Sequence, residues 1–403
     1  MANNIGAGSG FTPELWSARV QVLLKNNLVA GAICNTEERA NLSYGSRVHR
    51  PLPSQVYAQT YTKGTAATPQ DISSSDEYLD VDIAKIVPIY LDDIDKIQNK
   101  YKTLDIFSER AAYELRNQID FTVLAEGTSN AALGNSTNIT LSTSNVTGSF
   151  SQAKADLFNN GTEETKPWYT VVDGDCVSTI EQFMTSNGFK VSDDVITNGY
   201  GIAAYLGEYL GLHFFKSQNL PSLVVQTSAT QPSDGQVVII NGITFTAKTA
   251  LTPLPGEFLI GGSADAARAN LAALINDPFN VAASANYVAL TNTAAQPDAT
   301  NVKRRNLVAV NNNGADTLTL TAAGKMILGT STWTGATFGT QTMKYLVGQM
   351  GGVDLVLQED VTAEFARAAA NFKVGTNILT WDLYGKKMFT EGKQRTYAMT
   401  VTK

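Results

Sequence analysis

Few side chains in this chain have the type and spacing that catalysis or metal binding requires. Its two histidines, His49 and His213, are too few for a three-histidine zinc site. His213 lies in the apolar run 211–215, where a hydrogen-bonded core imidazole is more frequent than a general base. The two cysteines, Cys34 and Cys176, lack the paired spacing of a metal site or a disulfide framework, which favours a reducing compartment. The aspartates before Cys176 should raise the pKa of its thiol and reduce its reactivity.

Two short clusters look like ligand sites but lack necessary parts. The acidic cluster Asp92, Asp93 and Asp95 has neither the glycine nor the terminal glutamate of a calcium loop. The glycine pair Gly199 and Gly201 lacks the Lys-Ser/Thr of a P-loop and the third glycine of a dinucleotide fingerprint. We therefore predict no catalytic, cofactor-binding or metal-binding residue, and no enzymatic activity.

The composition is that of a globular chain. Hydrophobic residues make up 43% of the 403 residues and charged residues 17%, which suits two or three compact units. The net charge of −7 argues against nucleic-acid binding along the whole sequence, because phosphate neutralisation requires clustered Lys and Arg. The tight basic run Lys303-Arg304-Arg305 is predicted to be a solvated loop or strand end. Neither a membrane span nor a secretory signal is expected, since the chain lacks a run of about 18 apolar residues and residues 1–10 are small and polar.

A short helix is predicted close to the start of the chain. Thr12 can cap free N–H groups, Pro13 suits the first helical position, and Glu14 faces the positive helix end. An apolar stripe follows: Leu15, Trp16, Val20, Leu23 and Leu24. The helix either packs in the core of its own subunit or forms an arm on a neighbouring subunit.

Residues 41–91 predict a long extended arm. The stretch 41–75 is polar, contains Tyr57 and Tyr61, and has no helical period. Residues 45–53 look like a strand closed by prolines, which are excluded from central strands. Alternating apolar residues from Leu79 onward predict further strand up to residue 91. A two-stranded arm of this length is not stable alone in water, so we expect residues 50–91 to lie on another subunit.

The clearest helix in the sequence spans residues 104–126. Its apolar residues recur at three- and four-residue spacing: Leu104, Phe107, Ala111, Leu115, Ile119 and Val123. At about 1.5 Å per residue the helix would be roughly 34 Å long. We expect a packing helix with a solvated charged face, and no acid–base role for its carboxylates.

The segments after this helix predict mixed α and β packing. Residues 131–148 should form a loop and residues 150–158 a short helix. Residues 168–172 read as a buried strand, and a further helix begins near residue 179 and ends at Asn187-Gly188.

Composition changes at residue 226 and remains rich in Ala, Thr and Asn to about residue 341. Residues 234–246 predict two short strands about the turn Asn241-Gly242. Ser263 should cap a helix that Pro278 ends. Further strands are expected at residues 287–290, 306–310 and 317–321. These elements predict a self-contained α+β module inserted into a host domain at a surface loop.

From residue 342 onward the composition is again like that of the chain before residue 226. Residues 362–371 are predicted to be a helix, whereas residues 378–384 and 396–401 read as strands. A chain that ends in a strand is usually tied into a sheet, so the C-terminus should be ordered.

Several short motifs resemble, in their order along the chain, those of one family of proteins. They are Phe11-Thr-Pro-Glu-Leu-Trp-Ser17, Gly45-Ser-Arg-Val-His49, Val87-Pro-Ile-Tyr-Leu-Asp92, the helical run 108–120, Asn198-Gly-Tyr-Gly201 with Ser217-Gln-Asn-Leu-Pro221, and Gly385-Lys-Lys-Met-Phe389. Together they resemble a tailed-phage major capsid protein of the tailed-phage and herpesvirus capsid fold. The resemblance implies an α+β fold with an N-terminal arm, an extended loop, a long spine helix, and peripheral and axial domains. The inserted α+β domain is an addition to that fold.

The resemblance also implies a division of the chain into parts. The parts are an N-terminal arm (1–50), an extended loop (51–91), the spine helix and peripheral domain (92–170), the axial domain (171–225 and 342–372), the insertion domain (226–341) and closing peripheral strands (373–403).

On this resemblance the function lies in surfaces and not in a catalytic pocket. Such a subunit self-assembles into pentamers and hexamers of an icosahedral virion shell that encloses double-stranded DNA without sequence-specific binding. Assembly would take place in the host cytoplasm, away from membranes, with a separate scaffolding protein and a portal as partners and without a cofactor. The residues predicted at assembly interfaces are Trp16, Arg47, Tyr57, Tyr61, Arg304 and Arg305.

Two other classes of protein stay open from the residues alone. A phage tail-tube or adhesin protein is favoured if the inserted β segments form the main domain. A secreted carbohydrate-active protein is permitted by the Thr-, Asn- and Gly-rich β segments, since sequence spacing does not exclude two convergent carboxylates.

Overall fold

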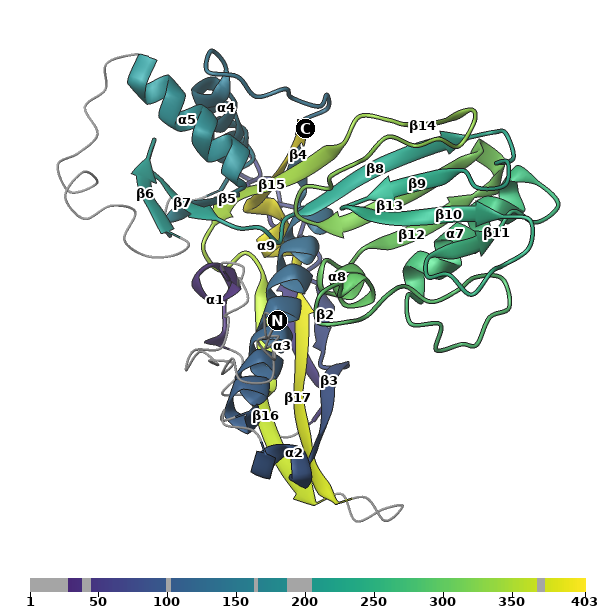
Figure 1. Cartoon of the computed structure of the whole chain (residues 1–403). Helices are drawn as coiled ribbons and strands as arrows, with labels where there is room; N and C mark the ends of the chain where they lie inside the picture. The colour runs from purple at the N-terminus through teal and green to yellow at the C-terminus, as the bar shows by residue number, and fades with distance from the viewer. Residues whose placement is uncertain (1–27, 38–44, 99–102, 163–165, 187–204, 368–373) are drawn as a thin grey trace, which may run out of the picture.

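The computed structural model of the chain describes residues 28–37, 45–98, 103–162, 166–186, 205–367 and 374–403 (Figure 1). A long helix lies along a narrow three-stranded sheet, and a much larger sheet crosses the upper end of that helix (Figure 1). The helix predicted from Thr12, including Trp16, lies outside the described residues.

The long helix is α3, Thr103–Asn130, which we call the spine helix. It confirms the prediction for residues 104–126 and is longer at both ends. Most of the predicted apolar stripe is buried, including Ala111, Leu115, Ile119 and Val123. Phe107, nearer the start of the helix, is partly exposed. The periodic stripe therefore predicted the buried face because one side of a helix repeats every three to four residues.

The narrow sheet consists of β16 (Asp354–Arg367), β17 (Gly375–Lys387) and β3 (Ile83–Asp92), in that order. Both pairs are antiparallel. The helix predicted at residues 362–371 is wrong, because Thr362 to Arg367 belong to β16 and pair with Trp381 to Thr376 of β17. Cross-strand pairing has overridden the local helix preference of this alanine-rich stretch.

The arm itself is shorter than the sequence suggested. β1 (Arg47–Pro53) and β2 (Ser74–Asp80) form its two-stranded base. β3 was predicted to belong to this arm, but it pairs with β17 instead. The two prolines of β1 fit a strand that has a partner on one side only. Residues 54–73 connect the strands without helix or strand, and we call them the arm tip.

The large sheet has ten strands and runs β12-β13-β8-β15-β5-β7-β6, with β14 beside β8 and β18 joining β15 to β4. Its strands are β4 (Leu133–Gly134), β5 (Trp168–Val172), β6 (Tyr205–Tyr209), β7 (Leu212–Lys216), β8 (Pro221–Ser228), β12 (Val308–Asn312), β13 (Thr317–Ala323), β14 (Ala336–Phe338), β15 (Thr342–Gln349) and β18 (Thr396–Thr402). β5 is buried at every residue, as predicted. The helices α4 (Val146–Asn159) and α5 (Gly174–Ser186) pack against this end of the sheet (Figure 1).

The predicted insertion has its own hydrophobic core. β9 (Val237–Ile240) and β10 (Ile243–Lys248) meet at Asn241 and Gly242, whose positive φ angles of 55° and 80° suit a tight hairpin turn. Ser263 caps α7 (Ala264–Asn276) by accepting from the amide of Ala266 at 3.1 Å. These elements and α8 (Asp298–Arg304) enclose a cluster of buried residues that spans positions 224–333. The strand predicted at residues 287–290 is wrong, because only Tyr287 forms a bridge, to Phe258 of β11 (Glu257–Leu259), and residues 288–290 have no regular secondary structure.

The insertion and the host share one continuous sheet. β8 pairs with β13 on one side and with β15 on the other. The segment 373–403 is divided, since β17 lies in the narrow sheet and β18 in the large one. The segment 342–372 is divided in the same way between β15 and β16. The partition of the chain into peripheral, axial and insertion domains therefore stays a prediction.

Four short elements complete the described chain. They are α1 (Ala30–Ile33), α2 (Asp93–Gln98), η3 (Asn313–Ala315) and α9 (Thr390–Gln394). The acidic cluster at Asp92 lies at the end of β3 and the start of α2, as expected for a strand end. Among the helices that the structure describes, none is long and apolar enough to cross a membrane.

Candidate assembly surfaces

The arm tip exposes apolar and aromatic side chains. Tyr57 is 69% exposed and Tyr61 71% exposed, and Val56 and Ile72 beside them are also exposed. Side chains hold the two sides of the tip together, since Gln70 bonds to both the amide and the carbonyl of Tyr57. Grouped exposed apolar residues commonly mark a protein–protein contact. The tip is therefore the strongest candidate for an intersubunit surface in the described chain.

The base of the arm is fixed to its own subunit. Arg50 of β1 forms an ion pair with Asp354 of β16 at 3.2 Å and lies over the ring of Phe389 at 4.5 Å. Glu77 of β2 accepts from the amide of Thr390 at 2.9 Å, and the bonds from the Thr390 hydroxyl and amide lower the pKa of this carboxyl. The base is thus anchored to the host, while the tip is free to contact a neighbour.

Gly385 explains how closely the arm base approaches β17. A Cβ atom at this position would overlap the backbone oxygen of Asp80 and the side chain of Leu79. A glycine is therefore required where β2 crosses β17. This gives a structural reason for the glycine in the motif 385–389.

Arg47 is an exposed residue of β1, in the arm base and not on the tip. Its Nε is 2.5 Å from a carboxylate oxygen of Asp80, and its guanidinium lies 3.8 Å from the centre of the Tyr78 ring. Next to it, His49 Nδ1 is 2.5 Å from Asp76. These pairs are exposed, so each contributes little to stability and is available to a partner.

The basic run 303–305 ends a helix and is not a loop or strand end, although Lys303 and Arg305 are exposed as predicted. Lys303 and Arg304 end helix α8, where positive side chains suit the negative helix end. Arg304 Nε is 2.6 Å from Glu114 of the spine helix. Desolvation raises the pKa of Glu114, and Arg304 opposes that effect. Arg304 thus joins the insertion to the spine helix within one subunit, and its role at an assembly interface stays a prediction.

Asp120 connects three parts of the chain that are distant in sequence. One of its oxygens accepts from the amides of Val29 and Ala30, both at 2.7 Å. The other accepts from the Asn219 side chain at 2.9 Å, and Asn219 also donates to Asn117 at 2.8 Å. Burial raises the pKa of Asp120, and these hydrogen bonds oppose the rise. The motifs 108–120 and 217–221 therefore meet in one buried network behind the assembly surfaces.

A second buried network holds the C-terminus. Lys403 Nζ lies 2.6 Å from Asp173 and 2.6 Å from the Tyr345 hydroxyl, which itself donates to Asp173. Asp173 also accepts from the amide of Cys176 at 3.0 Å at the start of α5. Burial, followed by the charge of Asp173, raises the pKa of the Cys176 thiol, which confirms the predicted direction. The C-terminus is ordered, as predicted.

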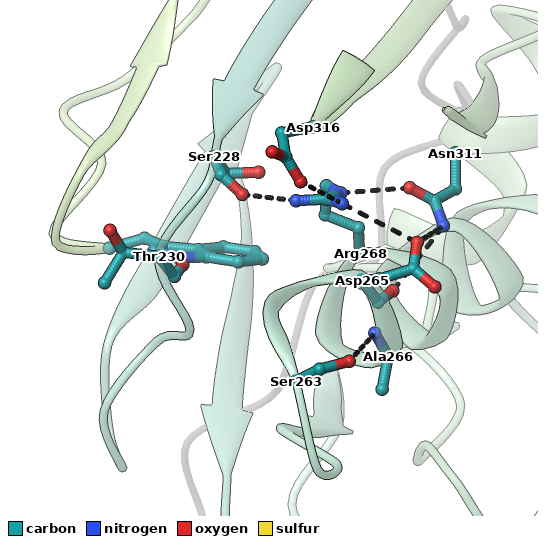
Figure 2. Close-up of polar contacts among 9 residues, drawn as sticks. Ser228, Thr230, Ser263, Asp265, Ala266, Arg268, Asn311 and Asp316 are labelled. Atoms are coloured by element: carbon teal, nitrogen blue, oxygen red, sulfur yellow. Dashed lines mark hydrogen bonds and ion pairs between the residues drawn. The ribbon is translucent and has the colours of Figure 1, made fainter. Parts of the chain in front are cut away.

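The insertion contains a buried arginine that the sequence did not reveal. Arg268 of α7 has no exposed surface. It donates to the Ser228 carbonyl, to Asn311 at 3.0 Å and to Asp316 at 3.0 Å, with Asp265 at 3.6 Å (Figure 2). Asn311 also donates to Asp265 at 2.6 Å. Since a buried charge is tolerated only with such partners, this network fixes α7 to the edge of the large sheet.

The six predicted interface residues do not form one patch. Tyr57 and Tyr61 lie on the arm tip and Arg47 lies at the arm base. Arg304 lies against Glu114 of the spine helix, Arg305 lies beside Asn241 of the insertion, and Trp16 lies outside the described residues. The buried networks of Asp120, Asn219 and Arg268 were not predicted from the sequence, because the partners of these residues are remote along the chain. Within the described ranges, no cluster of three or more His, Cys, Asp or Glu residues could hold a metal ion.

The chain is similar to known proteins in its fold. No family model matches the chain, and no curated protein matches its sequence. A solved structure from Mycobacterium phage Che8 is similar over 98% of both chains, with 14% identity and a TM-score of 0.57. The capsid structure of cyanophage P-SCSP1u is similar over 100% of this chain and 96% of that chain, with 13% identity and a TM-score of 0.54.

A chain from the asymmetric unit of the bacteriophage PhiM1 mature capsid is also similar. The similarity extends over 100% of this chain and 96% of the PhiM1 chain, with 10% identity and a TM-score of 0.50. The chain therefore has the α+β fold of phage capsid proteins, which confirms the resemblance drawn from the motifs.

Proposed function

We propose that this chain is a major capsid protein that self-assembles into pentamers and hexamers of an icosahedral shell. The observation that carries the proposal is the likeness to solved phage structures over nearly the full length of both chains. A likeness that includes the arm, the spine helix and both sheets favours a shell subunit over a tail-tube or adhesin protein. The role is structural, and none of the described side-chain networks needs a catalytic function to explain it.

The arm supplies the contact on which assembly depends. Its base is anchored through Arg50 and Glu77, and its tip exposes Tyr57 and Tyr61. A rigid base with an apolar tip lets one subunit reach a neighbour in a fixed direction. Head-to-tail contacts of this type close into rings when the rotation that relates neighbouring subunits divides a full turn evenly.

The partners follow from the same proposal. The shell would enclose double-stranded DNA without sequence-specific binding, and the net charge of −7 would limit adhesion of DNA to its wall. A separate scaffolding protein and a portal would take part in assembly in the host cytoplasm, and the product would be the virion capsid. The insertion would project from the outer surface, where it does not obstruct ring closure.

Electron microscopy of the purified protein tests the proposal directly. Closed shells are expected, whereas tubes or dispersed monomers under all assembly conditions would contradict it. Deletion of residues 55–75 should leave a folded, soluble subunit that forms no shells. Normal particles from that deletion would show that the arm tip is not an assembly contact.

Point variants provide a milder test of the tip. Tyr57→Ser with Tyr61→Ser should reduce shell yield without lowering the stability of the subunit. The matched control is Leu254→Ser with Val281→Ser, which removes similarly exposed apolar side chains from the insertion. Equal shell yields from the two double variants would count against a specific role for the tip.

A further inference from the structure

A cavity of about 580 Å³ lies where the insertion meets the host. The host contributes Asp175, at the start of α5, and Gln218. The insertion contributes Asn241, Arg305 and Lys325. The cavity thus joins segments that are far apart in sequence, and anything bound in it would contact both parts of the subunit.

Most charged groups around this cavity are already paired. Arg304 is paired with Glu114 at 2.6 Å, and Lys325 Nζ is 2.8 Å from Asp175. Asp175 also lies 3.6 Å from Lys403, which is itself paired with the buried Asp173. The acids of the cavity are therefore neutralised by lysines of the same chain.

Arg305 is the exception. Its Nη1 donates to the neutral side-chain oxygen of Asn241 at 3.1 Å. In the part of the chain that the structure describes, no carboxylate lies within ion-pair distance of this guanidinium. Desolvation at the cavity wall, and then repulsion from Arg304, lowers the pKa of Arg305. The cavity thus carries one positive charge without a matching anion.

We propose that this cavity binds a small oxyanion such as inorganic phosphate, with the Arg305 guanidinium as its main donor and Lys325 beside it. A guanidinium presents its donors in a planar fork that matches two oxygens of such an anion. The volume accommodates the anion together with water. Because the anion contacts insertion and host together, it binds the folded chain and stabilises it.

Thermal unfolding of the full-length unassembled subunit tests this site. Inorganic phosphate should raise the unfolding temperature saturably, by about 2–4 °C over sodium chloride of equal ionic strength at the same pH. Arg305→Gln should abolish that difference. Lys248→Gln, which removes a positive charge from the insertion away from the cavity, should leave it intact.

A second variant keeps the proposal testable if Arg305→Gln does not fold. Asn241→Asp places a carboxylate 3.1 Å from Arg305 and so supplies the missing negative charge from within the chain. This variant should be more stable than the wild type in chloride and should no longer respond to phosphate. The proposal is overturned if phosphate acts no differently from chloride, or if either cavity variant retains the full phosphate response.

Discussion

Asp382 is a buried carboxylate beneath the spine helix, and its replacement by asparagine should stabilise the subunit above pH 6. It lies on the same face of β17 as Thr380 and Tyr384, and the Tyr384 hydroxyl is 3.1 Å from Thr122 of α3. Asp382 is 0% exposed, and no side chain of the described structure donates a hydrogen bond to its carboxylate, which faces only the backbone amide and the charge of Lys85 on β3. An ionised carboxylate is costly in such surroundings.

The magnitude follows from the pKa of this carboxyl. Desolvation raises the pKa of Asp382 from 3.8 to about 6, the backbone hydrogen bond and the charge of Lys85 oppose the rise, and the charge of Asp360 adds to it. A folded pKa above the unfolded value means that the penalty is fully present above pH 6 and is lost as the pH falls toward 3.8. At ~1.4 kcal/mol per pKa unit, the penalty is at most about 3 kcal/mol at pH 8 and about 1 kcal/mol at pH 4.5.

Urea unfolding of the unassembled subunit at the two pH values measures this difference. Asp382→Asn should increase the free energy of unfolding at pH 8 and have a much smaller effect at pH 4.5. Hydrogen exchange should show slower exchange of β17 amides in the variant at pH 8. Asp71→Asn, on the exposed arm tip, should have no effect at either pH. A gain that is absent at pH 8, or equal at both pH values, would refute the reasoning.

Three further predictions concern the spine helix, the buried network and the insertion. Leu115→Asp should give insoluble protein, because an unpaired buried charge costs several kcal/mol, and wild-type-like soluble expression would contradict a buried face there. Asp120→Ala should destabilise the subunit by about 2–4 kcal/mol, since it removes the acceptor of two backbone amides and one of the acceptors of the Asn219 side chain. Hydrogen exchange at residues 29–30 should accelerate. The isolated insertion should unfold cooperatively when followed by circular dichroism. A segment of residues 221–341 should be more stable than a segment of residues 226–341, because Val224 belongs to the core of the insertion. If both segments are unfolded, the insertion depends on the host for its fold.

Local signals in the sequence were sufficient for several elements. The apolar repeat predicted the spine helix, Ser263 and Pro278 bounded α7, and Asn241-Gly242 predicted the hairpin turn. Each of these depends on residues within one or two turns of one another. Helix periodicity, capping and turn geometry are short-range effects, so the sequence carries them without the rest of the fold.

The tertiary structure decided which segments pair. Residues 362–367 form a strand because β17 lies beside them, and β3 joins β17 and not the arm. Arg304 meets Glu114, and Asp120 meets Asn219, only because the insertion and the 217–221 segment fold onto the spine helix. Strand partners and side-chain networks depend on contacts between residues that lie outside any one helix or turn, from about ten positions apart for β16 and β17 to 190 apart for Arg304 and Glu114. Local propensity does not encode such contacts, so the arm, the motifs and the helix were visible in the sequence, while the networks that hold them together were not.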